Sequence, residues 1–425
     1  MMILVFIISL FLFLLIGAPV AISMLSSAIV MLAVLGLFDT GILGDYLVKG
    51  ANNFSLMAIP FFILTGEIMN AGGVSRRIVE FASAFVGHIR GGLGYVVIMS
   101  GVIFAGLSGS AVADTAALGA ILIPMMIAKG YNKNSSTGLV AATGIIGTII
   151  PPSIPMILFG VVGGVSITQL FMAGIVPGVL IAMGLVIVWF FVSKKDNSET
   201  MPKANAKQKW KAFKGAFWAL LLPVIIIVGL RGGIFTPTEA GVVAAVYALI
   251  ISFFYKEIKW RQLTEVFVGT AKTTGIVMFV ASTAVVSGYA ITVAQIPREL
   301  VEFLSGLTSN PTVLLLIIML FLLVVGCVMD LTPAILIFTP VLLPVVTAVG
   351  IDPVYFGLLM VINLSIGLIT PPIGTVLYIG CGISKISIID ITKGILPFLL
   401  VQMGILLLLV LFPEIVTVPL GWFTE

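Results

Sequence analysis

Four short segments place glycine, proline, hydroxyl and carboxylate residues inside otherwise apolar stretches of the chain. They are Gly106–Ser110, Met329–Pro333, Pro151–Ser153 and Thr370–Pro372. A proline removes a backbone N–H and leaves a carbonyl group in the preceding turn without its helical partner. Carbonyls at the negative end of a half-helix suit a hard cation such as sodium. The segments therefore predict two sodium sites where the chain interrupts its helices.

Each predicted sodium site pairs one turn-like segment with one proline-interrupted helix, and most ligands are expected to be backbone carbonyls. Glycines near the prolines allow the two backbones to approach closely. The residues assigned to the first site are Gly106, Ser108, Ser110, Gly144, Gly147 and Ile150, and those assigned to the second are Gly326, Asp330, Asn363, Gly367 and Thr370. No metal other than Na⁺ is predicted.

The same turns also predict an anion site. Helices that start near Ser110 and Thr332 would present free N–H groups and a positive dipole end, which bind carboxylates. The predicted substrate-binding residues are Ser108, Ser110, Ser153, Asp330 and Thr332. For any single serine the alternative is a turn-forming or helix-packing role.

Acidic residues within apolar runs are costly and mark functional sites by default. Asp330, at a predicted turn, is the strongest candidate for substrate or ion coupling, and Glu67 lies late in an apolar run. Asp114 lies about one turn into a predicted helix, so a structural role at the helix N-terminus and a functional role both remain open. Glu239, three residues after Thr236, is typical of a capped helix start and is predicted to be structural.

The composition explains why these polar residues stand out. Of the 425 residues 60% are hydrophobic and 9% charged, with a mean hydropathy of +1.28. Soluble domains are about 45–50% apolar and about 25% charged. A soluble enzyme, a nucleic-acid-binding protein and a secreted disulfide-bonded scaffold are therefore excluded. With one histidine and two cysteines, no transition-metal site is expected.

The chain is an all-α polytopic membrane protein with an internal repeat. Apolar runs fall at 1–16, 20–37, 54–71, 92–107, 111–128, 135–162, 167–192, 215–230, 236–255, 273–294, 311–328, 332–349, 353–382 and 388–412. Seven runs lie on each side of a lysine-rich linker, and an offset of 220 residues aligns Gly106 with Gly326 and Pro151-Pro152 with Pro371-Pro372.

Two pairs of runs are joined by very short turns and are predicted to be re-entrant hairpins. The chain then has about ten membrane-spanning helices and two hairpins, and its halves are inverted repeats. This arrangement places every lysine and arginine except Lys49, Arg231 and Arg298 on the side of the linker, which predicts a cytoplasmic linker and periplasmic termini.

The predicted organisation divides the chain into three parts. They are a first repeat at 1–192 (scaffold helices 1–52, hairpin 92–130, broken helix 135–162), a cytoplasmic linker at 193–214, and a second repeat at 215–425 (scaffold helices 215–272, hairpin 311–350, broken helix 353–382). Inverted repeats with broken helices at matching positions are typical of secondary transporters, whose site lies at the repeat interface.

Two other functions compete with transport for the same residues. An intramembrane aspartyl protease would use Asp114 and Asp330 as a dyad that shares one proton, but their contexts, ADTAA and VMDLT, contain neither a GxGD nor a YD motif. A channel would not need paired hairpins with candidate coupling-ion sites. The transporter hypothesis is therefore preferred, and no enzymatic activity is expected.

Four motifs resemble the large membrane subunit of TRAP transporters, the DctM family. They are IPFFILTGEIMNAGG (59–73), GLSGSAVADTAALG (106–119), IIPPSIPMI (149–157) and GGIFTPTEAG (232–241). The resemblance covers nearly the whole chain and, within the family, is to the large subunits of sialic acid systems. It implies Na⁺-coupled uptake of an organic acid across the bacterial inner membrane by an elevator-type transport domain.

The resemblance also implies partners and substrates. The expected partners are a small four-helix membrane subunit of the DctQ type, a periplasmic substrate-binding protein of the DctP type and the lipid bilayer, without nucleic acid. The expected substrate is sialic acid (N-acetylneuraminate), and the alternative is a C4-dicarboxylate or another organic acid. No cofactor is expected besides Na⁺ as coupling ion, and the sequence has no G-x-x-x-x-G-K-[ST] motif for ATP.

Overall fold

The computed structural model describes residues 2–194, 199–255, 257–308 and 310–424 and, within them, contains helices and no strand. The helices before the linker are α1 (Met2–Leu15), α2 (Val20–Val34), α3 (Thr40–Ala51), α4 (Ala58–Ala71), α5 (Val74–Val86), α6 (Gly92–Ser108), α7 (Ala111–Ala128), α8 (Lys133–Gly144), α9 (Ile154–Gly163) and α10 (Ile167–Ser193). Two short 3-10 helices, η1 (Phe54–Met57) and η2 (Ile145–Thr148), precede α4 and follow α8.

The helices after the linker repeat this order. They are α11 (Ala206–Arg231), α12 (Pro237–Phe254), α13 (Trp260–Val293), α14 (Ile296–Leu307), α15 (Pro311–Val328), α16 (Leu331–Ala348), α17 (Pro353–Gly367), α18 (Thr375–Ser384), α19 (Ile388–Leu411) and α20 (Glu414–Thr424). Shifted by 220 residues, the bounds of α6 to α10 fall within a few residues of those of α15 to α19. The repeat seen in the glycines and prolines is therefore also a repeat of helices.

The predicted interruptions are present in both halves. The first broken helix consists of α8, η2 and α9, with Pro151-Pro152 between η2 and α9, and the second consists of α17 and α18, with Pro371-Pro372 between them. Both Pro–Pro bonds are cis. The predicted hairpins are the pairs α6–α7 and α15–α16, each joined by two residues.

The scaffold differs from the sequence prediction at one boundary. The apolar run predicted at 273–294 is the second part of α13, a continuous 34-residue helix that begins at Trp260. Lys272 lies within it as an exposed side chain. A long aliphatic stem can carry a charge to the membrane surface without breaking the helical hydrogen bonds, so Lys272 does not end the helix. The matching part of the first half is divided into α3, η1 and α4, where Asn53 caps η1.

Nine helices of the described residues are long and apolar enough to cross a membrane. This number counts single long apolar helices, whereas the ten predicted crossings count passages of the chain through the membrane, some of which are made by short or broken helices. The nine include the hairpin limbs α7, α15 and α16, which are long and apolar, and leave out α1, α2 and the pieces of the two broken helices, which are shorter. The chain is a multi-pass membrane protein.

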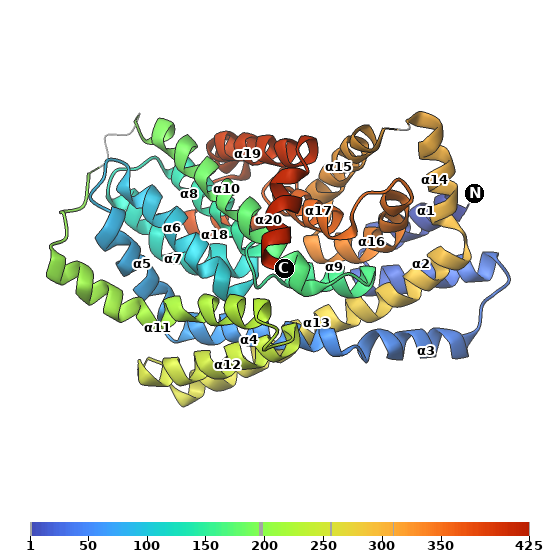
Figure 1. Cartoon of the computed structure of the whole chain (residues 1–425), viewed down its shortest axis with the longest axis horizontal. Helices are drawn as coiled ribbons and strands as arrows, with labels where there is room; N and C mark the ends of the chain where they lie inside the picture. Colours follow the sequence, from blue (N-terminus) through green and yellow to red (C-terminus); the bar gives the residue numbers. More distant parts are fainter. Residues whose placement is uncertain (1, 195–198, 256, 309, 425) are drawn as a thin grey trace.

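The helices form two groups in Figure 1. α3, α4, α11, α12 and α13 lie along one long side of the molecule, and the hairpins and broken helices lie above them. α13 packs on α2, α3 and α4, and α4 packs on α12. In the other group the two repeats interlock, because α8 packs on α19 and α18 packs on α7.

Segments predicted to share the cytoplasmic side contact one another. The Lys129 ammonium lies 2.9 Å from the Glu199 carboxylate and lowers the pKa of that carboxyl group. Arg77 Nη2 lies 2.6 Å from Glu257 Oε1, and the Arg77 guanidinium lies 3.9 Å from the centre of the Tyr255 ring. The base of the first hairpin and the start of α5 are thus joined to the linker and to the α12–α13 connection.

Candidate functional site

The first interruption is the turn between α6 and α7. Gly109 has a φ of +66°, and Ser110 caps α7 by accepting a hydrogen bond from the Ala113 N–H (3.4 Å). A Cβ on Gly109 would lie 2.6 Å from the Pro152 carbonyl oxygen. Glycine is needed here both for the left-handed backbone and for the close approach. The tip of the first hairpin therefore lies directly against the first broken helix.

Within that broken helix, Ser153 caps α9. Its hydroxyl accepts a hydrogen bond from the Met156 N–H (3.3 Å) and donates one to the Thr148 carbonyl oxygen (2.6 Å), and the side chain is fully buried. Ser153 is predicted to contact the substrate, but its side chain is not among those that line the cavity described below. Its hydroxyl is engaged in joining the two pieces of the broken helix.

The second hairpin meets the second broken helix in the same way. The Ile373 N–H donates a hydrogen bond to the Cys327 carbonyl oxygen (3.2 Å), which joins the segment after Pro371-Pro372 to the end of α15. Asp330 occupies the N-cap position of α16, but its side chain does not cap the helix. Instead, Asp330 Oδ1 accepts a hydrogen bond from the Thr375 hydroxyl at the start of α18 (3.3 Å).

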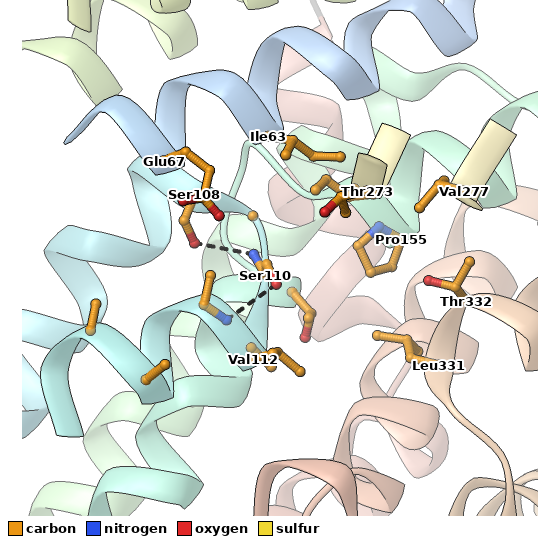
Figure 2. Close-up of a pocket in the computed structure, with 18 of the residues that line it drawn as sticks. Ile63, Glu67, Ser108, Ser110, Val112, Pro155, Thr273, Val277, Leu331 and Thr332 are labelled. Atoms are coloured by element: carbon orange, nitrogen blue, oxygen red, sulfur yellow. Dashed lines mark hydrogen bonds between the residues drawn. The ribbon is translucent and has the colours of Figure 1, made fainter. Parts of the chain in front are cut away.

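A cavity of about 490 Å³ lies where both hairpin tips face the scaffold. Figure 2 shows Glu67 and Ile63 of α4 on one side of it, Ser108 and Ser110 of the first tip beneath them, and Leu331 and Thr332 of the second tip opposite. Its polar lining consists of Glu67, Asn70, Ser108, Ser110, Thr148, Thr273, Asp330 and Thr332.

Four of the five predicted substrate-binding residues line this one cavity, and they come from both repeats. They are Ser108, Ser110, Asp330 and Thr332, separated by more than 200 positions in the sequence. Two carboxylates, those of Glu67 and Asp330, face the cavity, and no lysine or arginine is among its lining residues. A negatively charged occupant must therefore be balanced by helix N-termini or by bound cations.

Sequence reasoning missed two polar residues of the scaffold wall. Asn70 lies three residues after Glu67, so both side chains occupy one face of α4, and both line the cavity. The spacing of Glu67 and Asn70 was available as a signal. Thr273 comes from α13, and nothing in its local sequence distinguishes it from the other threonines of that helix.

Asp114 is enclosed on the far side of the first hairpin tip. It is 1% exposed, one carboxylate oxygen accepts a hydrogen bond from the Ser108 hydroxyl, and the other has no hydrogen-bond partner among the described residues. A Cβ on Gly147 would collide with that unpartnered oxygen, and one on Gly144 would collide with the Thr115 hydroxyl, which also lacks a partner. Oxygens left unpaired in a buried position suit a hard cation.

The segments of the first predicted sodium set meet around this carboxylate, because η2 packs on both α6 and α7. The sequence leaves both a structural and a functional role open for Asp114. A carboxylate oxygen without a partner favours the functional alternative, since burying an unpaired charge is costly unless a cation or proton compensates it.

The second predicted sodium set is also brought together. Gly326 of α15 and Gly367 of α17 touch, because a Cβ on Gly367 would lie 2.6 Å from backbone atoms of Gly326. The Asn363 amide donates to the Met319 carbonyl oxygen (2.7 Å), while its side-chain oxygen is buried and has no hydrogen-bond partner among the described residues. The Thr370 hydroxyl donates to a carbonyl one turn earlier.

Comparison with known proteins identifies relatives along almost the whole chain. The family model of the DctM component of the tripartite ATP-independent periplasmic transporters matches residues 7–415. A Haemophilus influenzae protein described as a TRAP transporter large permease is 63% identical over 94% of this chain and 100% of its own length. The 2,3-diketo-L-gulonate TRAP transporter large permease YiaN of Escherichia coli is 49% identical over 96% of each chain.

The predicted similarity to sialic acid systems is one of several. The sialic acid TRAP transporter large permease SiaM of Vibrio cholerae is 39% identical over 94% of this chain and 93% of its own, which is less than for YiaN. Similarity therefore does not single out sialic acid. Among solved structures, the Alcanivorax borkumensis YdaH transporter matches 92% of this chain and 91% of its own with a TM-score of 0.65 at 16% identity, a likeness of fold.

Proposed function

The chain belongs to the DctM component family of the tripartite ATP-independent periplasmic transporters, and we propose that it is the permease subunit of a sodium-coupled importer of an organic acid. The observation that carries the proposal is the cavity between both hairpin tips and the scaffold helices α4 and α13. Its lining combines helix starts, hydroxyl groups and two carboxylates. These groups can hold a polar molecule that is otherwise insoluble in the membrane.

Sodium would bind beside the cavity, where each hairpin tip meets its broken helix. The first ion would be held near the Asp114 carboxylate by the set Gly106, Ser108, Ser110, Gly144, Gly147 and Ile150, and the second by the set Gly326, Asp330, Asn363, Gly367 and Thr370. Each site has one buried oxygen without a hydrogen-bond partner among the described residues. At the first site it is Asp114 Oδ2, from a residue outside the predicted set, and at the second it is Asn363 Oδ1. Bound cations would offset the negative charge of the substrate and of Glu67 and Asp330.

The charge of the cavity bears on the substrate class. A C4-dicarboxylate would bring two negative charges beside two carboxylates, with no cationic side chain among the lining residues. A sugar acid such as sialic acid or 2,3-diketo-L-gulonate brings only one carboxylate, together with several hydroxyl groups. The Glu67 and Asp330 carboxylates can accept hydrogen bonds from these hydroxyl groups. We therefore favour a sugar acid, with sialic acid as the first candidate and a C4-dicarboxylate as the alternative.

The two helix groups suggest how transport proceeds. The hairpins and broken helices would move as an elevator-type body against α4 and α13 and carry substrate and sodium together. A small DctQ-type membrane subunit and a periplasmic DctP-type binding protein would complete the three-component transporter in the bacterial inner membrane. An aspartyl protease would need the Asp114 and Asp330 carboxylates to face the same cavity. Asp330 lines the cavity and Asp114 does not, which argues against this alternative.

The test is uptake into proteoliposomes that contain this chain with its small subunit and its binding protein. Radiolabelled sialic acid, 2,3-diketo-L-gulonate and a C4-dicarboxylate are each supplied with an inward sodium gradient and with a potassium gradient. We expect uptake of a sugar acid under the sodium gradient alone. Uptake that is equal with potassium would refute sodium coupling, and uptake of the dicarboxylate alone would refute the substrate class.

Asp330→Ala tests the site itself. We expect loss of uptake with unchanged assembly, because the variant removes the cavity carboxylate and its bond to Thr375. The matched control is Glu239→Gln, which neutralises an exposed helix-capping acid outside the cavity. Normal uptake by Asp330→Ala would remove Asp330 from the transport site.

A further inference from the structure

A second groove of about 470 Å³ lies on the linker side of the molecule, away from the transport cavity. One wall is α5, the other is the end of α7, and the segment before α11 closes it. The apolar part of the lining consists of Val79, Ala84, Ile121, Met125, Met201, Pro202 and Ala204, and the polar part of Arg76, Glu80, Ser83, Lys203 and Gln208. The groove is thus apolar within and charged at its rim.

The rim carries an excess of positive charge. Its one carboxylate, Glu80, is already paired with Arg76 at 3.1 Å. The nearby Glu199 is paired with Lys129 at 2.9 Å, whereas Lys203 has no ion-pair partner among the described residues. The first nine residues of α11 add four more lysines, at positions 207, 209, 211 and 214.

Aromatic side chains place this rim at a membrane surface. Trp210 is 65% exposed and stacks on Phe213 with ring centres 5.6 Å apart, and the Lys209 ammonium lies 5.5 Å from the Phe85 ring. Tryptophan is enriched where a membrane helix passes through the headgroup region, and lysine is enriched on the cytoplasmic side. Lysines alternating with aromatic residues are therefore expected at the level of the inner-leaflet headgroups.

We propose that this groove binds an anionic phospholipid of the inner leaflet. Its phosphate would lie between Arg76 and Lys203, and an acyl chain would follow the apolar wall made by Ile121 and Met125. Basic pockets between membrane helices on the cytoplasmic side bind anionic lipid headgroups in this manner. One wall belongs to the hairpin limb α7 and the other to α5, so the lipid would occupy the seam between them. The site is independent of the proposed substrate and rests only on the predicted cytoplasmic location of the linker.

The experiment is native mass spectrometry of the full-length chain in detergent, titrated with phosphatidylglycerol or with phosphatidylcholine of the same acyl chains. We expect saturable binding of phosphatidylglycerol. The double variant Arg76→Gln/Lys203→Gln should lower this affinity about 25-fold, because each cation near the headgroup contributes about fivefold. A matched control, Arg298→Gln/Lys272→Gln, removes the same charge. Arg298 makes the equivalent pair with Glu302 (3.1 Å), and both control residues lie outside the groove.

A second variant keeps the charges and fills the groove. Ala84→Trp should abolish the saturable binding of phosphatidylglycerol, since Ala84 lines the apolar wall and a tryptophan side chain there would fill the groove. Equal affinity for phosphatidylcholine, or unchanged affinity in the Arg76/Lys203 variant, would overturn the proposal. So would displacement of the lipid by millimolar inorganic phosphate, because the groove would then be a site for a soluble anion.

Discussion

Replacing Gly367 by alanine tests the contact between the two interruptions of the second half. Gly367 is the last residue of α17 and crosses Gly326 of α15 with almost no space between the backbones. An alanine Cβ would lie 2.6 Å from Gly326 Cα and C, whereas ordinary contacts of a Cβ begin at 3.4 Å. The helices must therefore separate by the difference, about 0.8 Å, and the obstacle is backbone that no rotamer change can move away.

The expected loss follows from two opposing effects. Overpacking of a close contact lowers the free energy of unfolding by about 1–3 kcal/mol. Replacing glycine by alanine within a helix raises it by about 0.5–1 kcal/mol. We expect a net loss of stability of about 1–2 kcal/mol. Gly326→Ala should lose less, because its nearest contact is 3.1 Å. Gly404→Ala is the control, since that glycine lies within α19 with no atom within 4 Å of its Cβ position, and it should be stabilised.

The assay is the midpoint of thermal unfolding in detergent for all three variants, followed by the sodium dependence of uptake. Gly367→Ala should unfold at the lowest temperature and require more sodium for half-maximal uptake, because the proposed carbonyl ligands lie at this crossing. If Gly367→Ala were as stable as Gly404→Ala and kept the sodium dependence of the unmodified protein, both the close contact and its place beside a sodium site would be refuted.

Two further predictions concern topology and helix capping. A cysteine at Asn134 should react with a membrane-impermeant reagent only from the cytoplasm and one at Asn310 only from the periplasm, and periplasmic labelling at Asn134 would contradict the inverted repeat. Thr236→Ala should destabilise α12 by about 1 kcal/mol because it removes the N-cap, whereas Glu239→Gln should cost less since glutamine can also accept the Thr236 N–H bond. Unfolding midpoints compare the two variants, and a larger loss for Glu239→Gln would contradict the capping argument.

The interruptions were predictable because the residues that cause them act locally. A proline lacks its N–H in any surroundings, and Ser110 and Ser153 cap the helices that follow them. The scaffold wall of the cavity was harder to predict, because Thr273 gains its role only from the packing of α13 against a hairpin that lies far away in the sequence. The continuity of α13 through Lys272 was hard to predict for a related reason, since the charge of an exposed lysine says little about where a helix ends.

The two halves share a backbone plan but distribute their acids differently. At the 220-residue offset the N-cap Ser110 corresponds to Asp330, and the enclosed Asp114 corresponds to Ala334. Ser110 uses its side chain to cap α7, whereas the Asp330 side chain leaves its helix uncapped and faces the cavity. A cation beside Asp114 would be shielded from water and from the substrate, and one near Asp330 would experience the charge of whatever fills the cavity. We therefore expect the second sodium site to be the one whose affinity depends on substrate, which would link ion binding to cargo through Asp330.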